Sequence, residues 1–284
     1  EVKALSPYVQ TVREFPPGHY MDASMALRPF PGHQAEPVPE DDPQALARHL
    51  RLRIEAAVAA NVGHGRIGSW LSGGLDSSVI ATMVARHVPG VHTFAGGTEG
   101  SPDIEHARQM AKFLGTKHHE IIIDGERVLT ALGPAIEALE SFDALLVRSS
   151  VLNYLVGVEA GARVDVSFSG EGGDELFGGY DYLKSLSEDE LPAELLDITG
   201  RLRNTALQRV DRCAAAGSLC VHVPFLNSHV VSLARAIPAR YKIKRSGDKA
   251  IEKWILRASM EGSMPESVLW RPKEKFWQGS GVGS

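Results

Sequence analysis

RIGSWLSGGLDSSVIATM, residues 66–83 of the chain, has the order of a buried strand, a glycine turn and a helix start. Residues 66–71 are short and apolar enough to form a strand in a sheet that is covered on both faces. Asp76 and Ser77 are residue types that often cap helix N-termini, and the apolar residues after them are spaced for one side of a helix. The stretch therefore predicts a strand, a loop and a helix over residues 77–87.

The loop of this unit, Ser72-Gly73-Gly74, has the chemistry of a phosphate-binding loop. Two of its three residues have no Cβ, so the backbone can come close to a ligand. The helix N-terminus that follows offers unpaired N–H groups and the positive end of a dipole, and both favour an anion. The carboxylate of Asp76 lies beside this anion site and would repel a phosphate. Its position is explained if a magnesium ion bridges the carboxylate and the phosphate.

This loop is not the common nucleotide P-loop, because no lysine follows its glycines. The order Ser-Gly-Gly-Leu-Asp-Ser-Ser, residues 72–78, resembles instead the pyrophosphate loop of the ATP pyrophosphatases. Such enzymes cut ATP between the α and β phosphates and adenylylate an oxygen of their substrate. An ordinary strand-to-helix turn is the alternative interpretation of a short glycine loop.

The composition bounds the class of protein. The chain has 284 residues, 43% of them hydrophobic, which is enough for one large domain or two modest ones. Its net charge of −5 argues against a nucleic-acid partner. Cys213 and Cys220 are too few for a disulfide framework and are expected to pack helices. No apolar run could span a membrane and no signal peptide is visible, so we expect a cytoplasmic protein without a membrane partner.

The first 40 residues differ from the rest. Seven prolines exclude a long helix there, short apolar pieces at 9–12 and 19–21 predict edge strands, and residues 36–43 predict a linker. From residue 43 to residue 61 the apolar side chains recur with helical spacing. Because the first residue is Glu rather than Met and residues 279–284 are glycine-rich, we expect a fragment of a longer protein.

Strand and helix patterns alternate through the middle of the chain. This alternation predicts an α/β fold, a parallel twisted sheet with helices on both faces. The predicted strands are residues 66–71, 91–95, 119–123 and 164–169, and the predicted helices are 77–87, 103–114, 127–141 and 148–161. Loops 72–76, 96–103 and 170–174 should converge, because ligands lie at the carboxyl ends of such strands. The C-terminal part is expected to be helical, without strands, over residues 188–216, 226–236 and 248–260, before a closing loop at 271–278.

A second chemical cluster is SGEGGDELFGGY, residues 169–180, which holds five glycines and three carboxylates. Acids this close repel one another unless a cation neutralises them. The simplest candidate for this cation is magnesium. Asp76 and Asp174 would hold it, and phosphate oxygens would complete its coordination shell. Glu171 is then free for proton transfer, with Tyr180 as a candidate partner. Calcium binding or a simple turn is the alternative, although the EF-hand spacing is absent.

The chain resembles a known family at six motifs that occur in order. They are SGGLDSS, TFAGG-x-x-GSPD, KHHE, SGEGGDELFGGY, VPFLN and WRPKEKF. In this order they resemble the synthetase domain of the glutamine-dependent asparagine synthetases, over residues 43–284. Residues 1–30 resemble the tail of that family's N-terminal glutaminase domain, so the resemblance implies a remnant at 1–40 and a synthetase domain at 41–284. It also implies an adenine nucleotide α-hydrolase-like sheet.

The resemblance implies a two-step reaction that uses ATP and Mg²⁺. The side-chain carboxylate of aspartate attacks the α-phosphate of ATP, giving β-aspartyl-AMP and pyrophosphate, and ammonia then displaces AMP to give asparagine. The family's glutaminase nucleophile, an N-terminal cysteine, is missing from this sequence, so the chain as given is expected to take free ammonia. A homodimer is one assembly compatible with the resemblance.

The resemblance also implies roles for individual residues. Residues 72–77 correspond to the pyrophosphate cradle, and Asp76 and Asp174 to magnesium ligands. Glu171 and Tyr180 correspond to an acid–tyrosine pair near the acyl-adenylate, and Lys273 to a lysine that stabilises charge developing there. The implied ATP-binding set is Leu71, Ser72, Gly73, Gly74, Leu75, Asp76, Ser77, Ser78, Gly96, Ser169 and Gly170. Substrate or phosphate contacts are considered at Asp103, Arg148, Lys249 and Lys253, although the two lysines have solvated helix positions as an alternative.

Three positions bear on how closely the chain follows the family. Asn227 stands where the family has an aspartate after VPFL, so one acidic contact is lost. Gly96 stands where the family usually has a larger apolar residue near the adenine, so that wall of the pocket is altered. Arg148 matches a family arginine that could face a substrate carboxylate, and a salt bridge at a helix start is the alternative.

Two other functions are compatible with these motifs. One is an intramolecular amide former, such as a β-lactam synthetase or a lasso-peptide cyclase, because these enzymes share the scaffold. The other is a non-catalytic ATP-binding module. The joint presence of Asp76, Glu171, Asp174, Tyr180 and Lys273 speaks against the second, since a module without activity has no physical need for all five.

Overall fold

The structure is a computed structural model that describes residues 8–13, 15–30, 41–63, 65–247 and 249–272. Lys273, most of the loop predicted at 271–278 and most of the linker predicted at 36–43 lie outside these residues. Within the described part of the chain, no helix is long and apolar enough to cross a membrane.

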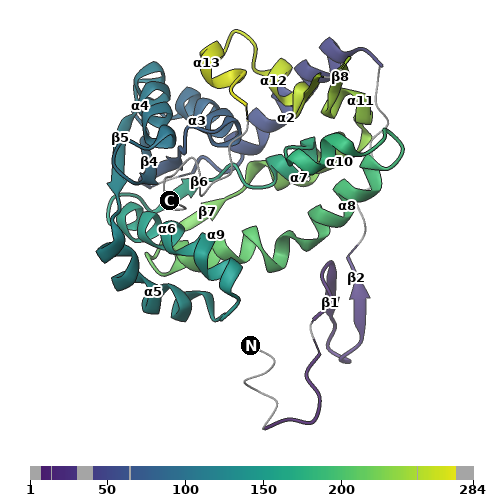
Figure 1. The fold of residues 1–284 in the computed structure, drawn as a ribbon. Coiled ribbons are helices and arrows are strands. Elements are labelled where there is room, and N and C mark those ends of the chain that lie inside the picture. The colour runs from purple at the N-terminus through teal and green to yellow at the C-terminus, as the bar shows by residue number, and fades with distance from the viewer. Residues whose placement is uncertain (1–7, 14, 31–40, 64, 248, 273–284) are drawn as a thin grey trace.

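A five-stranded parallel sheet forms the centre of the molecule (Figure 1). In spatial order its strands are β5 (Lys117–Ile122), β4 (His92–Gly97), β3 (Ile67–Trp70), β6 (Val166–Phe168) and β7 (Cys220–His222). All four residues of β3 are buried, as expected for a central strand. The predicted α/β fold is confirmed. The strand order reverses between β3 and β6, and in open α/β sheets ligands bind outside the carboxyl ends at such a switch point.

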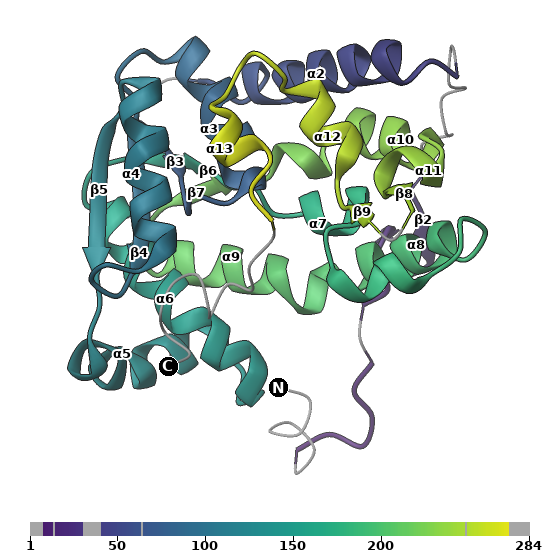
Figure 2. The ribbon, with the colours of Figure 1, turned by 45° about the horizontal axis from the view of Figure 1, so that its top comes forward.

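Helices cover both faces of this sheet (Figures 1 and 2). One face packs against α5 (Gly125–Leu139), α6 (Ala144–Gly161) and α9 (Ala206–Ala215), and the other against α2 (Pro43–Ala59), α3 (Leu75–His87) and α4 (Pro102–Leu114). Neighbouring residues of β4 separate the two cores, because Phe94 packs toward α6 and Ala95 toward α3 and α4. This alternation is the period of two that a strand imposes on its side chains.

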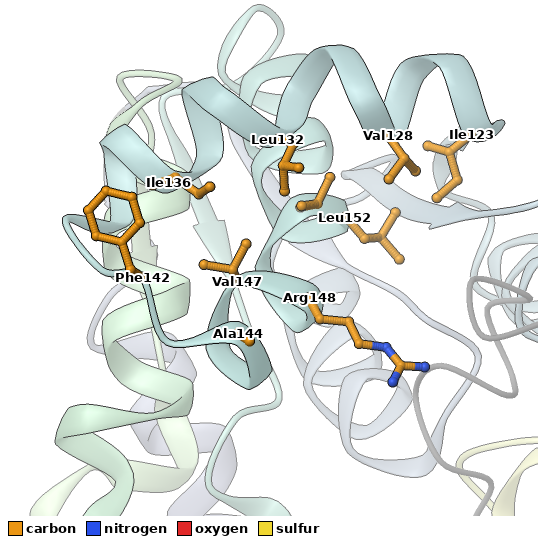
Figure 3. A pocket seen from close by; sticks show the side chains of 10 residues that line it. Ile123, Val128, Leu132, Ile136, Phe142, Ala144, Val147, Arg148 and Leu152 are labelled. Atoms are coloured by element: carbon orange, nitrogen blue, oxygen red, sulfur yellow. The ribbon is translucent and has the colours of Figure 1, made fainter.

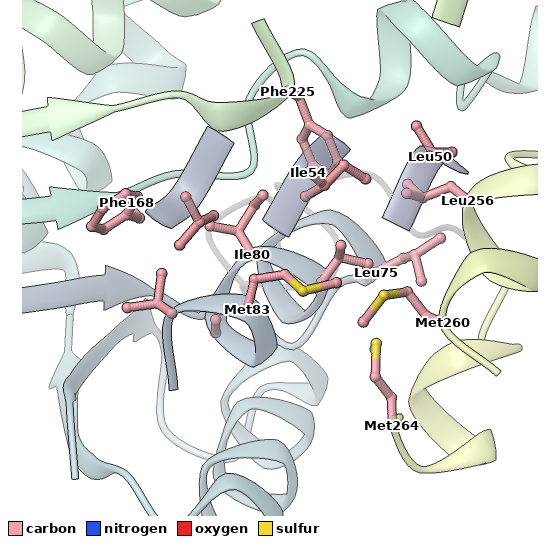
Figure 4. Packing of buried hydrophobic residues seen from close by; sticks show 14 of the residues in the cluster. Leu50, Ile54, Leu75, Ile80, Met83, Phe168, Phe225, Leu256, Met260 and Met264 are labelled. Atoms are coloured by element: carbon pink, nitrogen blue, oxygen red, sulfur yellow. The ribbon is translucent and has the colours of Figure 1, made fainter. Parts of the chain in front are cut away.

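The larger core joins α2 and α3 to the C-terminal helices (Figure 4). Leu50 and Ile54 of α2 meet Ile80 of α3, and Leu256 closes the cluster from the C-terminal part. All four side chains are fully buried, and each such burial contributes about 1.5–3 kcal/mol. Asp42 fixes where α2 begins, since its carboxylate accepts hydrogen bonds from the first-turn N–H groups.

The C-terminal part consists of short helices with two small strands. Its elements are α7 (Gly173–Phe177), η1 (Asp181–Ser185), α8 (Leu191–Arg201), η2 (Leu202–Asn204), η3 (Pro224–Leu226), α10 (Ser228–Ala236), α11 (Ala239–Lys242), β8 (Lys244–Ser246), β9 (Lys249–Ile251), α12 (Trp254–Ser259) and α13 (Glu266–Leu269). Figure 2 shows α10 and α12 beside α2, so the end of the chain returns to its beginning.

The prediction that no strand follows residue 183 is wrong. β7 extends the main sheet at its edge, and β8 and β9 pair as an antiparallel hairpin. Each has only three residues, too few for an alternating pattern to show in the sequence. Cys220 lies in β7 and is exposed, whereas Cys213 is buried in α9, so the helix-packing prediction holds for Cys213 alone.

Two predicted helices are interrupted. The helix predicted at 188–216 is broken by η2 after Gly200, a residue that weakens helices, and by the non-helical backbone of Thr205. The helix predicted at 248–260 begins only at Trp254, because β9 precedes it. The helix α3 starts two residues earlier than predicted, with Gly74 rather than Asp76 or Ser77 at its N-cap.

The N-terminal residues form a small hairpin below the main body (Figure 1). It pairs β1 (His19–Met21) with β2 (Leu27–Pro29) in antiparallel register. The strand predicted at 19–21 is confirmed, whereas residues 9–12 form no strand.

Candidate active site

A cavity of about 530 Å³ opens at the carboxyl ends of β3, β4 and β6, beside the switch point. This volume falls within the range of small-molecule sites. The cavity is lined by most of the residues expected from the sequence, namely Ser72, Gly74, Leu75, Asp76, Ser77, Gly96, Asp103, Ser169, Gly170, Glu171, Asp174 and Tyr180. The three loops that were predicted to converge therefore meet at one site.

The first glycine loop is tied to the first turn of α3 by Ser77. Ser77 Oγ accepts a hydrogen bond from the Ser72 N–H at 3.1 Å and donates one to the Gly74 carbonyl at 3.2 Å. Gly73 has φ +76°, and a Cβ there would lie 2.7 Å from the Asp103 carbonyl, so only glycine fits. The N-cap Gly74 makes no side-chain cap bond, and the first residues of α3 line the cavity, as expected of an anion site at a helix N-terminus.

The second glycine loop packs directly on the first. A Cβ at Gly170 would lie 2.7 Å from the Ser77 nitrogen, and a Cβ at Gly173 would lie 2.5 Å from Asp76 Cγ. The absence of these two Cβ atoms lets the first turn of α7 approach the first turn of α3. As a result Asp76 and Asp174, almost a hundred residues apart, face the same cavity.

Lys253 joins these two carboxylates. Its Nζ lies 2.5 Å from Asp76 Oδ2 and 2.5 Å from Asp174 Oδ1, and its side chain is 5% exposed. Burial alone would lower the pKa of Lys253, but Asp174 and Asp76 together raise it, so the ammonium form is the stable one. The sequence indicated only that this lysine was one of several candidate phosphate contacts.

Glu171 and Tyr180 line the same cavity but have other partners. Glu171 Oε1 accepts a hydrogen bond from Arg209 Nη2 at 2.9 Å, and Tyr180 donates its hydroxyl proton to Glu175 Oε1 at 2.5 Å. Burial raises the pKa of Glu175 to about 7, against the lowering effect of the Tyr180 hydrogen bond. The acid–tyrosine contact in the structure is therefore between Glu175 and Tyr180. Arg209 is a site residue that no sequence motif indicated.

The end of the described chain reaches over the first loop. Arg271 Nη2 donates to Asp103 Oδ1 at 3.1 Å, and Arg271 Nη1 donates to the Gly73 carbonyl at 3.3 Å. Both Arg271 and Pro272 line the cavity. Asp103, expected as a substrate or phosphate contact, is thus held in a nearly buried ion pair at the rim of the loop.

Several expected residues lie elsewhere. Leu71, Gly73 and Ser78 are buried behind the loop and do not line the cavity. Lys249 is exposed in the β8–β9 hairpin. Arg148 borders a separate apolar cavity of about 480 Å³ between α5 and α6, and Figure 3 shows its guanidinium directed away from the apolar side chains.

The two departures from the family pattern have structural explanations. Asn227 is the N-cap of α10, and its Oδ1 accepts a hydrogen bond from the His229 N–H at 3.0 Å, a role that asparagine fills as well as aspartate. Gly96 lies against α6, where a Cβ would come within 2.6 Å of Leu152 and Val156. These two α6 side chains line the cavity and form the wall that a larger residue 96 would otherwise form.

The carboxylates fit magnesium better than a cation that needs a full protein cage. Among the described residues, no group of three or more His, Cys, Asp or Glu side chains could hold a metal ion. Magnesium is commonly held by one or two carboxylates together with substrate phosphates and water. Asp76 and Asp174 beside a phosphate-binding loop match that donor set.

A glycine loop before a helix N-terminus, two facing carboxylates and a cavity at the switch point are the features of a ligand site in an open α/β sheet. The sequence matches the family described as Asparagine synthase over residues 49–204 and 188–283, so the chain belongs to that family. It is 38% identical over 250 residues to "Asparagine synthetase [glutamine-hydrolyzing]" of Gallus gallus, covering 84% of this chain and 44% of that protein. It is 32% identical over 303 residues to "Asparagine synthetase B [glutamine-hydrolyzing]" of Escherichia coli (strain K12), covering 99% of this chain and 54% of that protein.

The chain thus spans about half the length of these curated relatives. Among solved structures, it is similar to NMN synthetase from Francisella tularensis with a TM-score of 0.37 and 15% sequence identity. That match covers 80% of this chain and 81% of the other.

Proposed function

We propose that this chain is an ATP-dependent amide-forming ligase that converts aspartate to asparagine. The aspartate side-chain carboxylate attacks the α-phosphate of ATP and releases pyrophosphate, and ammonia then displaces AMP from β-aspartyl-AMP. The observation that carries this proposal is that the loop at Ser72–Ser77 and the carboxylates Asp76 and Asp174 open into one cavity. Family membership and the two curated relatives support the same reaction.

In this proposal the two glycine loops bind the phosphates of ATP. The N–H groups at the start of α3 would donate hydrogen bonds to the pyrophosphate part, which carries most of the negative charge that leaves. Asp76 and Asp174 would hold Mg²⁺, which when bound neutralises part of that charge. The adenine would lie toward Gly96, where Leu152 and Val156 supply an apolar wall.

Residues on the other side of the cavity would act on the acyl group and the amine. The attacking ammonia must lose a proton, so a carboxylate beside it is the expected base. Glu171 is our candidate, because it lines the cavity and its carboxylate is held there by the hydrogen bond from Arg209. Glu175 and Tyr180 would position the aspartate end of the intermediate, and Lys273 would stabilise charge on the reacting carbonyl and phosphate.

The names of the curated relatives bear on the nitrogen source. The relatives are named glutamine-hydrolyzing. We propose that residues 1–40 belong with a glutaminase unit of that kind, and that the synthetase half by itself uses free ammonia. A cytoplasmic location and a homodimer stay predictions.

Two assays on the same protein test this proposal. ATP–pyrophosphate exchange with aspartate measures the first step, and asparagine formed from aspartate, ATP and ammonium chloride measures both steps. A panel of other carboxylic acids, including substrates that carry their own amine, serves as the comparison. Exchange that depends on aspartate supports the proposal. Exchange with another acid but not with aspartate would favour the intramolecular amide formers, and ATP binding without any exchange would favour a non-catalytic module.

A further inference from the structure

Lys253 lies where the proposed function requires a metal ion. Its ammonium contacts Asp76 and Asp174 at 2.5 Å each, and these are the two carboxylates that would hold Mg²⁺. The carboxylate side chains are only 18% and 23% exposed, so water screens their mutual repulsion poorly. The lysine neutralises that repulsion from within the chain.

The backbone around Lys253 fixes the position of its amine. Lys253 has φ +54°, a left-handed conformation that is uncommon for a side chain of this size. Its neighbour Glu252 is buried and bound by Arg257 at 2.7 Å and Lys184 at 3.1 Å. Gly179 leaves the required space, since a Cβ there would lie within 2.1 Å of Lys253 Cε. The contact is therefore built into the fold rather than made by a loosely held surface lysine.

An ammonium and a directly bound Mg²⁺ cannot share the same place. Magnesium requires its oxygen ligands at about 2.0–2.1 Å in near-octahedral geometry. The Lys253 nitrogen is already within hydrogen-bond distance of one oxygen from each aspartate, in the space between them. A metal that binds both carboxylates must displace it, and the displaced ammonium then needs another anion because it is buried.

We propose that Lys253 and Mg²⁺ are alternative partners of Asp76 and Asp174. In the metal-free protein the lysine holds the two carboxylates together. Magnesium replaces it when ATP is present, because the phosphates give the displaced ammonium a new partner. This inference rests on the proposed function, and it deepens it by making metal binding depend on the nucleotide.

The test measures binding of Mn²⁺ alone, without nucleotide, by electron paramagnetic resonance. Lys253→Met and Lys253→Gln remove the internal cation, Lys253→Arg keeps it, and Lys112→Met is the matched control on the exposed face of α4. We expect the Met and Gln variants to bind Mn²⁺ at least tenfold more tightly than the wild type, and the Arg variant and the control to bind it as the wild type does. The double variant Asp76→Asn/Lys253→Met should lose the gain, which locates the metal.

Thermal unfolding gives a second readout that does not depend on activity. Without metal the Met and Gln variants should melt at lower temperature than the wild type, and Mg²⁺ should restore them. Wild-type protein should gain no thermal stability from submillimolar Mg²⁺ alone, because a ligand stabilises the fold only where its concentration exceeds its Kd.

The inference is overturned if the Met and Gln variants bind Mn²⁺ no more tightly than the wild type. Strong stabilisation of the wild type by submillimolar Mg²⁺ alone would also overturn it, and this arm needs no variant to fold. Asparagine formation combined with either of these results would leave the proposed function standing. The expected Mn²⁺ results without asparagine formation would instead leave the inference standing and remove the proposed substrate.

Discussion

At the scale of single residues, the charged side chains of the cavity are held in ion pairs. Asp76 and Asp174 share Lys253, and Glu171 pairs with Arg209. Each pair is largely removed from water, where an ion that loses its partner is strongly destabilised. A substitution that changes charge here affects both ligand binding and the arrangement of the remaining charges, so isosteric changes such as Asp→Asn are the informative ones.

The first prediction concerns the two carboxylates assigned to Mg²⁺. Asp76→Asn and Asp174→Asn should each lower ATP–pyrophosphate exchange by on the order of 10³-fold or more, since loss of charge neutralisation at a leaving phosphate costs several kcal/mol. Each amide can still accept a hydrogen bond from Lys253, so the fold should persist. Exchange assays at saturating Mg²⁺, with circular dichroism on the same samples, check both parts.

Asp181→Asn is the matched control for this prediction. Asp181 follows the same glycine-rich loop, but its side chain is 89% exposed and forms a surface ion pair with Lys184. An exposed pair of this kind contributes little, about 0–1 kcal/mol. Near-wild-type exchange in either Asp76→Asn or Asp174→Asn would remove the metal assignment.

The second prediction uses Lys242, a buried lysine outside the cavity. Its residue is only 5% exposed, and burial, followed by the positive charge of Arg235, lowers the pKa of Lys242 to about 8. The unfolded chain therefore holds this proton more tightly than the folded one. The free energy of unfolding should rise between about pH 8 and pH 10.5, and below pH 8 the lysine should destabilise the fold by roughly 3 kcal/mol at most.

Lys242→Met should remove the destabilisation that the buried charge of Lys242 causes below pH 8. We expect its free energy of unfolding at pH 7 to exceed that of the wild type by about 1–3 kcal/mol, and its profile to be flatter between pH 8 and pH 10. Urea unfolding at four pH values measures this, with Lys112→Met as the exposed lysine control. A variant with the same pH slope as the wild type would show that Lys242 stays charged in the folded protein.

At the scale of elements, the site depends on how closely β4 approaches α6. Gly96 of β4 faces Leu152 and Val156 of α6, and a Cβ at residue 96 would come within 2.6 Å of both side chains. That distance is closer than carbon atoms can pack, so a larger residue requires the α6 side chains or the helix to move. The width of the proposed adenine pocket is therefore set by a strand–helix contact.

The third prediction follows from this contact. Gly96→Ala should destabilise the fold by about 1–3 kcal/mol through overpacking and should raise the KM for ATP. Leu152→Ala in the same chain should relieve part of the cost, so the double variant should be more stable than the sum of the single effects predicts. Gly200→Ala in α8 is the control, because nothing lies within 4 Å of a Cβ there. Additive effects would mean that β4 and α6 do not limit the pocket.

Helices and strands whose apolar residues follow a clear local spacing could be predicted from the sequence. Short elements that depend on contacts with distant residues could not. The glycine loops and the strands β3 to β6 follow from apolar runs bounded by Gly, Ser and Asp. β7 has three residues and a polar end, so its place in the sheet comes from pairing with β6 rather than from its own sequence. Thr205 interrupts the helix without a proline, so residue propensities gave no sign of the break.

At the scale of the whole molecule, the site is completed by side chains far along the chain from the loops. Lys253 follows Asp76 by 177 residues, and Arg271 follows Gly73 by 198 residues. Local spacing carries no information about such contacts, because they require the C-terminal helices to fold back on α2 and α3. A role for Lys273 in the site requires the C-terminal helices to fold back over the sheet, and Arg271 and Pro272, which precede it, line the cavity.

The two steps of the proposed reaction can be tested separately, because Glu171 and Lys273 come from different parts of the chain. Glu171 comes from the loop after β6 and is held by Arg209, whereas Lys273 is the residue that follows Pro272. A base is needed only when ammonia attacks. A lysine that stabilises charge on the carbonyl oxygen and the phosphate is needed in both steps.

Glu171→Gln should therefore spare ATP–pyrophosphate exchange more than asparagine formation, whereas Lys273→Ala should slow both, by a factor on the order of 10²–10³. Glutamine still accepts the Arg209 hydrogen bond, so the loss in Glu171→Gln reports proton transfer more than a broken contact. Exchange and product formation are measured side by side for each variant, with melting temperature as the check on folding. Equal loss of both activities in Glu171→Gln would contradict its role as the base of the second step. Unchanged activities in Lys273→Ala would show that the chain does not deliver residue 273 to the cavity that Arg271 and Pro272 line.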